Sequence, residues 1–160
     1  MATNGNKDLI REHVKNINEA NRDATKIRAW GEKIYAPSYI CHYPFRDMSR
    51  EEAIGLWVTM VSGFPGFEWS TDSLVSEENT VINVSTIKGV HNGILPGMPA
   101  TGKPILVKWV TMYRIGGEKI LEGWEFPDLL SMMTQLGVIP SSVLESFGRS
   151  GQEGSFSRTL

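Results

Sequence analysis

Residues Ile115–Gly137 read IGGEKILEGWEFPDLLSMMTQLG, and they are the most informative part of the sequence. Its Gly-Gly pair suits a two-residue hairpin turn, because such turns need positive φ angles. An apolar strand that carries Glu125 comes next, and a Pro-Asp pair then opens a short helix that a glycine closes. Two carboxylates, Glu125 and Asp128, therefore stand three residues apart where a strand meets a helix. That arrangement suits proton-transfer chemistry.

Toward the N-terminus the apolar spacing is helical. Residues Asp8–Tyr35 carry apolar side chains at helical spacing, and the polar segment Asn21–Asp23 interrupts them, which predicts two consecutive helices. The short aromatic piece Tyr39–Tyr43 is β-prone. Ser49–Glu52 fits a capping box and opens a third helix that runs to Phe64.

After the third helix the apolar period changes to two. Four segments alternate in this way and are predicted to be strands: Phe67–Ser76, Thr80–His91, Lys103–Ile115 and Glu118–Phe126. The insert Gly93–Gly102 holds three glycines and two prolines, which predicts a loop. Helices followed by a run of antiparallel strands predict an α+β architecture, with a curved sheet wrapped around the N-terminal helices. A small-molecule site would lie in the cavity between the two layers.

Length and composition limit the possible classes of protein. A chain of 160 residues with 41% hydrophobic and 21% charged residues is expected to form one domain over residues 1–140. Residues 141–160 are rich in Ser and Gly, and we expect a flexible tail there. The net charge of −2 gives no basic face for nucleic acid.

Targeting and metal signals are weak. No apolar run approaches the ~18–20 residues that span a bilayer, and the polar N-terminus has no signal-peptide core. The lone Cys41 rules out a disulfide framework and fits a reducing cytoplasm. The three histidines are scattered and lack the spacing of metal ligands, which argues against a metal site.

The direction of Glu125 depends on the register of the hairpin, because strand side chains point to opposite faces in turn. On Lys103–Ile115 the odd positions are the apolar ones, so the odd face is the buried one. A strict two-residue turn over Gly116-Gly117 would place Glu125 on the other face. A single bulge, or a turn of three or four residues, reverses that result. Periodicity therefore leaves the direction of Glu125 open.

Three motifs occur in order along the chain: KGVHNGILPGMPAT at Lys88–Thr101, MYRIGGEKILEGWEFPD at Met112–Asp128 and QLG at Gln135–Gly137. In this combination they resemble the SnoaL-like polyketide cyclase family, within the broader cone-shaped fold of nuclear-transport-factor-like proteins. The resemblance covers roughly Asp8–Pro140. It implies a cone-shaped, curved antiparallel or mixed sheet with a cavity against the helices.

The resemblance also implies a catalytic group. In that family the general acid/base is a carboxylate, normally Asp, three residues before the aspartate of the Pro-Asp pair. That position is Glu125 here, and its pKa would be raised by an apolar pocket. The chain departs from the family in having Glu for Asp, and in having Thr111 where some members have an assisting histidine. Asp128 lies between Pro127 and an apolar run, which favours a helix N-cap over catalysis.

Other candidates come from their positions. His91 lies at a strand end beside the predicted loop, where a neutral imidazole can relay protons or hold a substrate oxygen, although a lone histidine is often structural. Tyr35 at a helix end can bind a substrate oxygen or serve as a core aromatic residue, and the same alternatives hold for His42. Asp128 and His42 are secondary candidates. The residues predicted to line the pocket are Trp109, Thr111, Tyr113, Met98 and Trp124.

The resemblance implies a cofactor-free cyclase that closes a ring in a natural-product intermediate. We favour intramolecular opening of an epoxide by a hydroxyl, giving a pyran or furan, with Glu125 protonating the oxygen of the electrophile and His91 and Tyr35 positioning the attacking group. Aldol cyclisation of a polyketide is one alternative, and an isomerase or epoxide hydrolase on the same fold is another. A non-catalytic binding or dimerisation module is a third. We expect a small-molecule substrate, a cytoplasmic homodimer, no nucleic-acid or membrane partner, and no cofactor or metal.

Overall fold

The computed structural model describes residues 2–20 and 23–149. Its helices are α1 (Ala2–Ala20), α2 (Ala24–Ile34), α3 (Arg50–Gly63), α4 (Leu129–Leu136) and α5 (Ser142–Arg149). Its strands are β1 (Tyr35–Tyr43), β2 (Arg46–Ser49), β3 (Glu68–Glu77), β4 (Thr80–Val90), β5 (Pro104–Gly116) and β6 (Lys119–Pro127).

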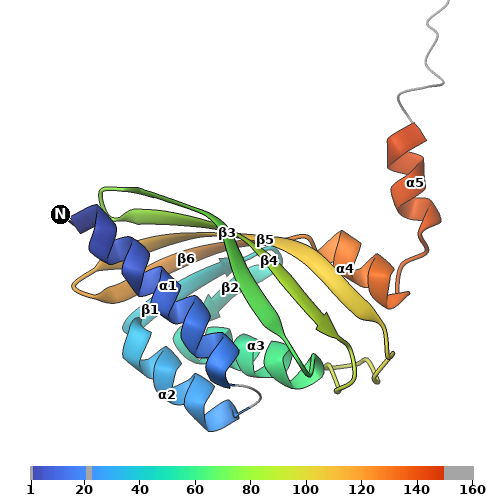
Figure 1. Cartoon of the computed structure of the whole chain (residues 1–160), viewed down its shortest axis with the longest axis horizontal. Coiled ribbons are helices and arrows are strands. Elements are labelled where there is room, and N and C mark those ends of the chain that lie inside the picture. Colours follow the sequence, from blue (N-terminus) through green and yellow to red (C-terminus); the bar gives the residue numbers. More distant parts are fainter. Residues whose placement is uncertain (1, 21–22, 150–160) are drawn as a thin grey trace, which may run out of the picture.

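The strands form one mixed sheet in the order β2-β1-β6-β5-β4-β3. β1 runs parallel to β6, and every other neighbouring pair is antiparallel. α1, α2 and α3 lie together on one side of this sheet (Figure 1), with α1 against β3 and α3 against β1. The α+β architecture predicted from the sequence is confirmed. The single core between the sheet and the helices is where a buried site can form.

Side-chain caps start two of the helices at the predicted places. The Asp23 carboxylate accepts hydrogen bonds from the backbone N–H groups of Thr25 and Lys26 at the start of α2. At the start of α3 the Ser49 hydroxyl and the Glu52 carboxylate each accept a hydrogen bond from the other residue's backbone N–H. These bonds satisfy N–H groups that have no partner within a helix, so local sequence fixes both starts.

The first strand of the sheet is longer than the β-prone piece Tyr39–Tyr43 that the sequence predicts. β1 begins at Tyr35 rather than Tyr39, and β2, which the alternation did not reveal, pairs antiparallel with its end. Pro37 obscures the start of β1, because proline cannot donate to a ladder. The structure accommodates it where the pairing with β6 shifts register between Tyr35 and Ile40.

The β5–β6 hairpin carries a bulge. Its two-residue turn is Gly117-Glu118, with φ angles of 56° and 62°, one residue later than predicted. Ile115 lies opposite Ile120, but the next pair is Arg114 with Glu122, so Leu121 is the extra residue. A shift of the turn by one residue moves each partner by two and leaves the faces unchanged. The bulge moves them by one more and reverses the faces beyond it.

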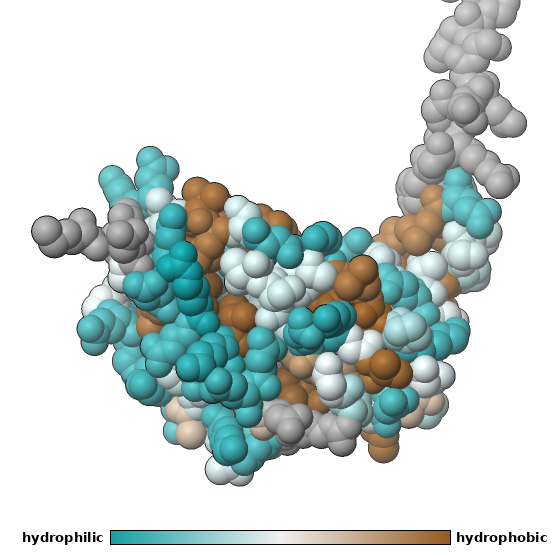
Figure 2. All heavy atoms as spheres, viewed as in Figure 1, coloured by the Kyte–Doolittle hydropathy of each residue, from teal (hydrophilic) through white to brown (hydrophobic). Residues whose placement is uncertain are grey.

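The C-terminal end adds two helices. α4 packs against β5 at one end of the sheet, whereas α5 stands off from the rest of the molecule (Figure 1). Part of the segment predicted to be a flexible tail is therefore helical, over Ser142–Arg149, and residues 150–160 lie outside the described part. The outward side of α1 is mostly hydrophilic (Figure 2). In the described ranges no helix is long and apolar enough to cross a membrane.

Candidate active site

Glu125 points into the interior of the protein. It lies on β6 directly opposite Thr111 on β5, on the face that the helices cover, and its side chain is only 5% exposed. The bulge at Leu121 is the cause, because without it Thr111 would face Trp124. The inward direction of Glu125, which periodicity left open, is thus settled by one extra residue.

Two donors hold one oxygen of the Glu125 carboxyl group. The indole N–H of Trp109 and the hydroxyl of Thr111 (2.8 Å) both donate to Oε2. Burial raises the pKa of Glu125 to about 7, and the two hydrogen bonds oppose that rise. Near neutral pH the group therefore exists in both protonation states. Because donors already occupy Oε2, the acidic proton belongs on Oε1, which accepts none of the hydrogen bonds that the structure shows.

A polar row crosses the inner face of the sheet on either side of Glu125. Asn83 on β4 pairs with Thr111, which pairs with Glu125. In the register of the parallel β1–β6 pair, where His42 faces Trp124, the next residue beside Glu125 is Tyr43. Polar or ionisable side chains on four adjacent strands thus share one face of an otherwise apolar core.

Two members of this buried region have unused hydrogen-bonding capacity. Both side-chain amide atoms of Asn83 are buried without a hydrogen-bond partner, and so is the hydroxyl of Tyr113. Thr111 lies near enough to the Tyr113 hydroxyl to lower its pKa, although burial raises that pKa more strongly. An unpaired buried amide costs about 1–3 kcal/mol of stability. Its retention in a native protein therefore calls for an explanation, such as a ligand that binds to it.

Two tyrosines on β1 lie near enough to the Glu125 carboxyl group for its charge to affect them. Burial raises the pKa of Tyr35 and of Tyr39 well above the ordinary value, and the nearby Glu125 carboxylate raises both further. The two rings are stacked with centroids 4.3 Å apart. Gly123 permits this arrangement, because a Cβ at that position would lie 2.4 Å from the Tyr39 hydroxyl oxygen. The glycine of the GWEFPD motif therefore makes room for a tyrosine beside the acid.

A second buried cluster lies behind Tyr35. His13 of α1 is fully buried, and its ring meets four aromatic rings edge-on: Tyr35, Trp57, Trp69 and Tyr113. Its Nδ1 accepts a hydrogen bond from the indole of Trp30 at 3.0 Å, and its Nε2 lies 3.0 Å from the Tyr35 hydroxyl. Burial lowers the pKa of His13 to about 3, so the imidazole is neutral in the physiological range.

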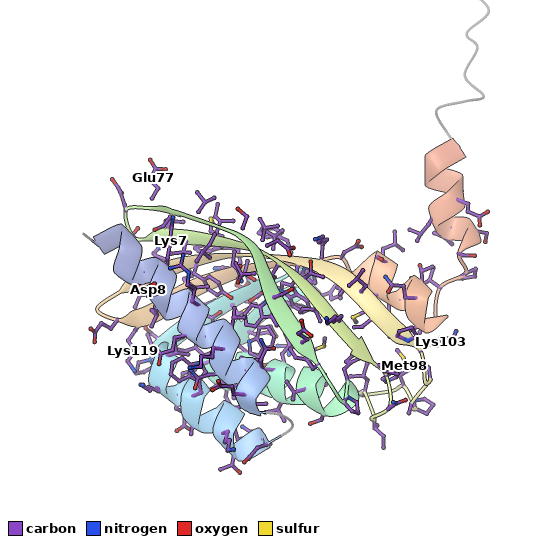
Figure 3. The ribbon with its side chains drawn as sticks, viewed as in Figure 1. Lys7, Asp8, Glu77, Met98, Lys103 and Lys119 are labelled. Carbon is purple, nitrogen blue, oxygen red and sulfur yellow. The ribbon has the colours of Figure 1, made fainter. Side chains whose placement is uncertain are left out.

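An apolar groove of about 630 Å³ opens beside this interior. It lies between the β1–β2 turn, α3, the loop that follows β4, and α4. Five of the seven methionines of the chain line it: Met48, Met60, Met98, Met132 and Met133. Figure 3 shows Met98 in the loop beyond β4. Flexible, polarisable methionines adapt to varied apolar ligands, so the groove suits an apolar molecule.

Tyr43 connects the groove to the acid. Its half-buried side chain lines the groove, and its ring lies 6.5 Å from the Trp109 ring that donates to Glu125. The neighbouring carboxylate contributes to raising the pKa of Tyr43 to about 12, with burial the larger cause. Glu125 itself does not line the groove, and Tyr43 is the groove residue that lies next to its hydrogen-bonding partner Trp109.

His91 is placed elsewhere. Its ring nitrogen Nδ1 lies 3.0 Å from the Thr101 hydroxyl, and its ring packs against Phe64. Its backbone carbonyl accepts hydrogen bonds from Thr101 and Gly102, and its N–H donates to the Lys103 carbonyl. These contacts fasten the two ends of the loop between β4 and β5. They favour the structural interpretation, and the catalytic role suggested for His91 stays a prediction.

His42 and Trp124, a secondary catalytic candidate and a predicted pocket residue, lie on the opposite face of the sheet from Glu125. They pair across β1 and β6, with ring centroids 5.0 Å apart. The ring nitrogens of His42 contact Asp47 and Glu122 at 2.8 Å, which raises the pKa of His42. The reason is the bulge, which turns Glu125 inward and Trp124 outward together.

Asp128 is a helix cap, as its position suggested. Its carboxylate accepts a hydrogen bond from the backbone N–H of Ser131 at 3.0 Å, at the start of α4. This bond keeps Asp128 at the helix end, and α4 places Leu129 and Met132 in the wall of the groove. The remaining predicted pocket residues, Trp109, Thr111, Tyr113 and Met98, lie in the interior or the groove.

Sequence reasoning missed Asn83 and His13. His13 had a signal, because it stands between Ile10 and Ile17 at helical spacing and so shares the buried stripe of α1. Asn83 had one too, as an odd residue on the strand that alternates between Val81 and Ile87, both buried. Polar residues within an apolar stripe are informative, since they are buried at a cost.

The fold and the site together define a small α+β protein with a protonatable carboxyl group buried beside an apolar groove. A family model for SnoaL-like polyketide cyclases matches residues 12–136, and the chain belongs to that family. A comparison with curated proteins finds no match.

Solved structures show the same fold. IdmH from Streptomyces antibioticus, described as a proposed polyketide cyclase, has a TM-score of 0.69 and 23% identity, covering 82% of this chain and 98% of its own. A proposed SnoaL-like polyketide cyclase from Jannaschia sp. CCS1 has a TM-score of 0.71 and 21% identity, covering 86% and 95%. AclR from Streptomyces galilaeus, described as a proposed hydroxylase, has a TM-score of 0.65 and 21% identity, covering 78% and 86%. At these identities the likeness concerns the fold alone.

Proposed function

We propose that this protein is a cyclase that closes an oxygen-containing ring in an apolar natural-product intermediate, with Glu125 as the general acid. The observation that carries the proposal is the Glu125 carboxyl group, buried and held through Oε2, with a pKa raised to about 7. An acid of this pKa retains its proton near neutral pH and yields it readily to a substrate oxygen.

The reaction we favour is opening of an epoxide by a hydroxyl of the same molecule. Glu125 donates the Oε1 proton to the epoxide oxygen as its C–O bond breaks. The substrate hydroxyl forms the new C–O bond and releases its own proton, which restores the protonated acid directly or through solvent. The product is a cyclic ether bearing a new hydroxyl, and the reaction is an isomerisation in which all atoms are retained.

The unpaired amide of Asn83 supports a hydroxyl-bearing substrate. A hydroxyl both donates and accepts, so it can satisfy Oδ1 and Nδ2 of Asn83 together. Asn83 and Glu125 are two strand positions apart, roughly 10 Å between backbones. The attacking hydroxyl at Asn83 and the epoxide oxygen at Glu125 would then lie at opposite ends of the closing ring.

Glu125→Gln tests this proposal because it keeps the shape of the side chain and removes the acidic proton. The probe is an aryl-substituted epoxy alcohol whose hydroxyl is placed to close a five- or six-membered ring, with cyclic ether measured by chiral chromatography. Loss of one catalytic acid should lower the enzymatic rate by about 10²–10⁴-fold. A Glu125→Gln variant that cyclises the probe like the wild type would show that the assignment is wrong.

Two other enzymatic reactions can be distinguished from this one by experiment. An epoxide hydrolase on this fold would incorporate oxygen from solvent, so the product formed in ¹⁸O-labelled water separates hydrolysis from cyclisation. Aldol cyclisation of a polyketide would use Glu125 as a base toward a carbon acid, and its rate would rise rather than fall as the carboxyl ionises above about pH 7. Burial of Glu125 argues against a non-catalytic module, in which a carboxylate without a chemical role would lie in solvent.

We also propose a homodimer that forms through the outer face of the sheet. The helices α1–α3 cover the opposite face, whereas on the outer face Phe126 is 58% exposed and Ile40 is 44% exposed. Phe126→Asp should therefore yield a monomer in light scattering. Phe45→Asp is the control, because Phe45 is 79% exposed but lies at the groove, so its replacement should leave the dimer intact. A monomeric wild type, or a dimeric Phe126→Asp, contradicts this proposal.

A further inference from the structure

The hydroxyl oxygen of Tyr35 lies within hydrogen-bonding distance of two ring nitrogens. The indole N–H of Trp57 donates to the hydroxyl oxygen at 3.2 Å, and His13 Nε2 lies 3.0 Å from the same oxygen. An indole can only donate. The direction of the second hydrogen bond depends on which ring nitrogen of His13 carries the proton.

Trp30 decides that tautomer. Its indole N–H donates to His13 Nδ1 at 3.0 Å, so Nδ1 must present a lone pair. A neutral imidazole then carries its proton on Nε2. The low pKa of His13, about 3, keeps the ring neutral. His13 therefore donates to Tyr35, and does not accept from it.

The Tyr35 hydroxyl is left to act only as a hydrogen-bond donor. Its oxygen accepts from both His13 and Trp57, which uses both lone pairs, and the structure shows no acceptor for its own proton among the described residues. Each hydrogen bond that a hydroxyl accepts makes its proton a better donor. Tyr35 stacks on Tyr39, whose hydroxyl lies against Gly123, two residues before Glu125 on the same face of β6, so this proton belongs to the same interior region as the acid. The charge of Glu125 also raises the pKa of Tyr35, after the larger effect of burial.

We propose that His13 is a positioning residue that makes Tyr35 a dedicated hydrogen-bond donor to a substrate oxygen beside Glu125. Trp30 fixes the His13 tautomer, His13 and Trp57 occupy the lone pairs of Tyr35, and Tyr35 presents its proton to the ligand. The part of this proposal that concerns the substrate rests on the proposed function and refines it. Tyr35 donates, together with Glu125, to the epoxide or carbonyl oxygen whose carbon is attacked, and does not hold the attacking hydroxyl. A carbonyl or epoxide oxygen, which only accepts, fits this donor.

The tautomer can be measured without any substrate, by ¹⁵N NMR of histidine-labelled protein. The wild type should carry the His13 proton on Nε2 between about pH 5 and pH 8, because this range lies above its pKa of about 3. Trp30→Phe removes the donor to Nδ1 and should give a fraction of the Nδ1–H form. Trp69→Phe is the matched control. Trp69 also packs edge-on against His13, at 5.4 Å, but its indole N–H has no partner, so the tautomer should not change.

The donor role of Tyr35 can be measured with acetophenone, whose carbonyl oxygen only accepts. Its infrared C=O stretch should shift to lower frequency in the wild type, lose that shift in Tyr35→Phe, lose part of it in His13→Leu and regain it in His13→Gln, whose amide can donate as Nε2–H does. Thermal unfolding of each variant reports whether the fold survives. Trp30→Phe tests the same series of hydrogen bonds, from Trp30 through His13 to Tyr35, without altering His13.

The inference is overturned by a wild-type His13 protonated on Nδ1, by a tautomer unchanged in Trp30→Phe, or by a C=O shift unchanged in Tyr35→Phe. Absence of any shift in the wild type counts against the donor as well. The readouts do not require turnover, so failure of the proposed cyclase activity would be seen separately. Should the C=O shift behave as described while Glu125→Gln has wild-type activity, the role of Glu125 fails and that of Tyr35 stands.

Discussion

Thr111 and Glu125 lie directly opposite each other on β5 and β6, and the Thr111 hydroxyl donates a 2.8 Å hydrogen bond to the carboxyl oxygen Oε2. This bond lowers the pKa of Glu125 against the larger effect of burial. Thr111 stands where some family members have an assisting histidine. A hydroxyl, unlike an imidazole, does not take up a proton near neutral pH. Thr111 therefore acts on the acidity and the orientation of Glu125.

Thr111→Val should therefore raise the pKa of Glu125 further. The ionised carboxyl group loses a hydrogen bond that a charged acceptor makes strong, which corresponds to about one pH unit. If the protonated acid is the active form, the alkaline limb of the kcat/KM profile moves to higher pH. A ¹³C titration of the Glu125 carboxyl carbon without substrate provides the direct check. A shift of either quantity to lower pH would contradict the assignment.

The buried acid also makes stability depend on pH. The pKa of Glu125 is raised from 4.5 to about 7 in the folded protein, so the folded state binds its proton more tightly than the unfolded state. The stability associated with that proton is fully present below about pH 4.5 and is lost as pH rises through about 7. The loss by pH 8 is about 3 kcal/mol.

Glu125→Gln should not show this loss. Urea unfolding at about pH 5 and pH 8 should give a larger fall in the free energy of unfolding for the wild type than for the variant. His42, whose pKa is raised by its carboxylate partners, also contributes stability that disappears with rising pH, but equally in both proteins. Equal falls in the two proteins would mean that the Glu125 pKa is not raised.

Sequence patterns predicted the helix starts and most strands because those features depend on local chemistry. The capping box at Ser49 and the N-cap at Asp128 use side chains within three residues of the groups they satisfy. The direction of Glu125 was a different problem. It depends on the bulge at Leu121, and a bulge is stabilised by packing on both faces of the sheet, which no local pattern contains. The loop around His91 shows the same limit, since its contacts come from residues apart in sequence.

Deletion of Leu121 tests the role of the bulge. Removing the extra residue gives regular pairing, because Ile115 already faces Ile120 and Arg114 already faces Glu122, and it leaves Glu125 opposite Thr111 on the inner face. The ¹³C signal of Glu125 should therefore keep a pKa of about 7. A pKa in the ordinary range for a glutamate in the deletion variant would show that the bulge itself, and not the register beyond it, places the acid.

Asn83→Leu should separate stability from function. Leucine has nearly the shape of asparagine, so the change removes two unpaired buried amide atoms and should leave the protein as stable or about 1–2 kcal/mol more stable. The same change should weaken turnover of the epoxy alcohol about tenfold or more, since the attacking hydroxyl loses its partner. Denaturant unfolding and kcat/KM are measured on one preparation. Lower stability with unchanged kcat/KM would instead identify Asn83 as a structural residue.

The groove can be tested at Gly55, which lines it from α3. A Cβ built at Gly55 has no atom within 4 Å, so side chains there extend into the groove without strain on the core. Gly55→Ala should stabilise the helix by up to about 1 kcal/mol and leave the kinetics nearly unchanged. Gly55→Phe should fill the space between Leu56, Met98 and Met132, raise KM for the epoxy alcohol, and leave the pKa of Glu125 near 7. This pair separates helix propensity from occlusion, because only the second variant blocks the groove. Unchanged KM in Gly55→Phe would mean that the substrate reaches Glu125 by another route.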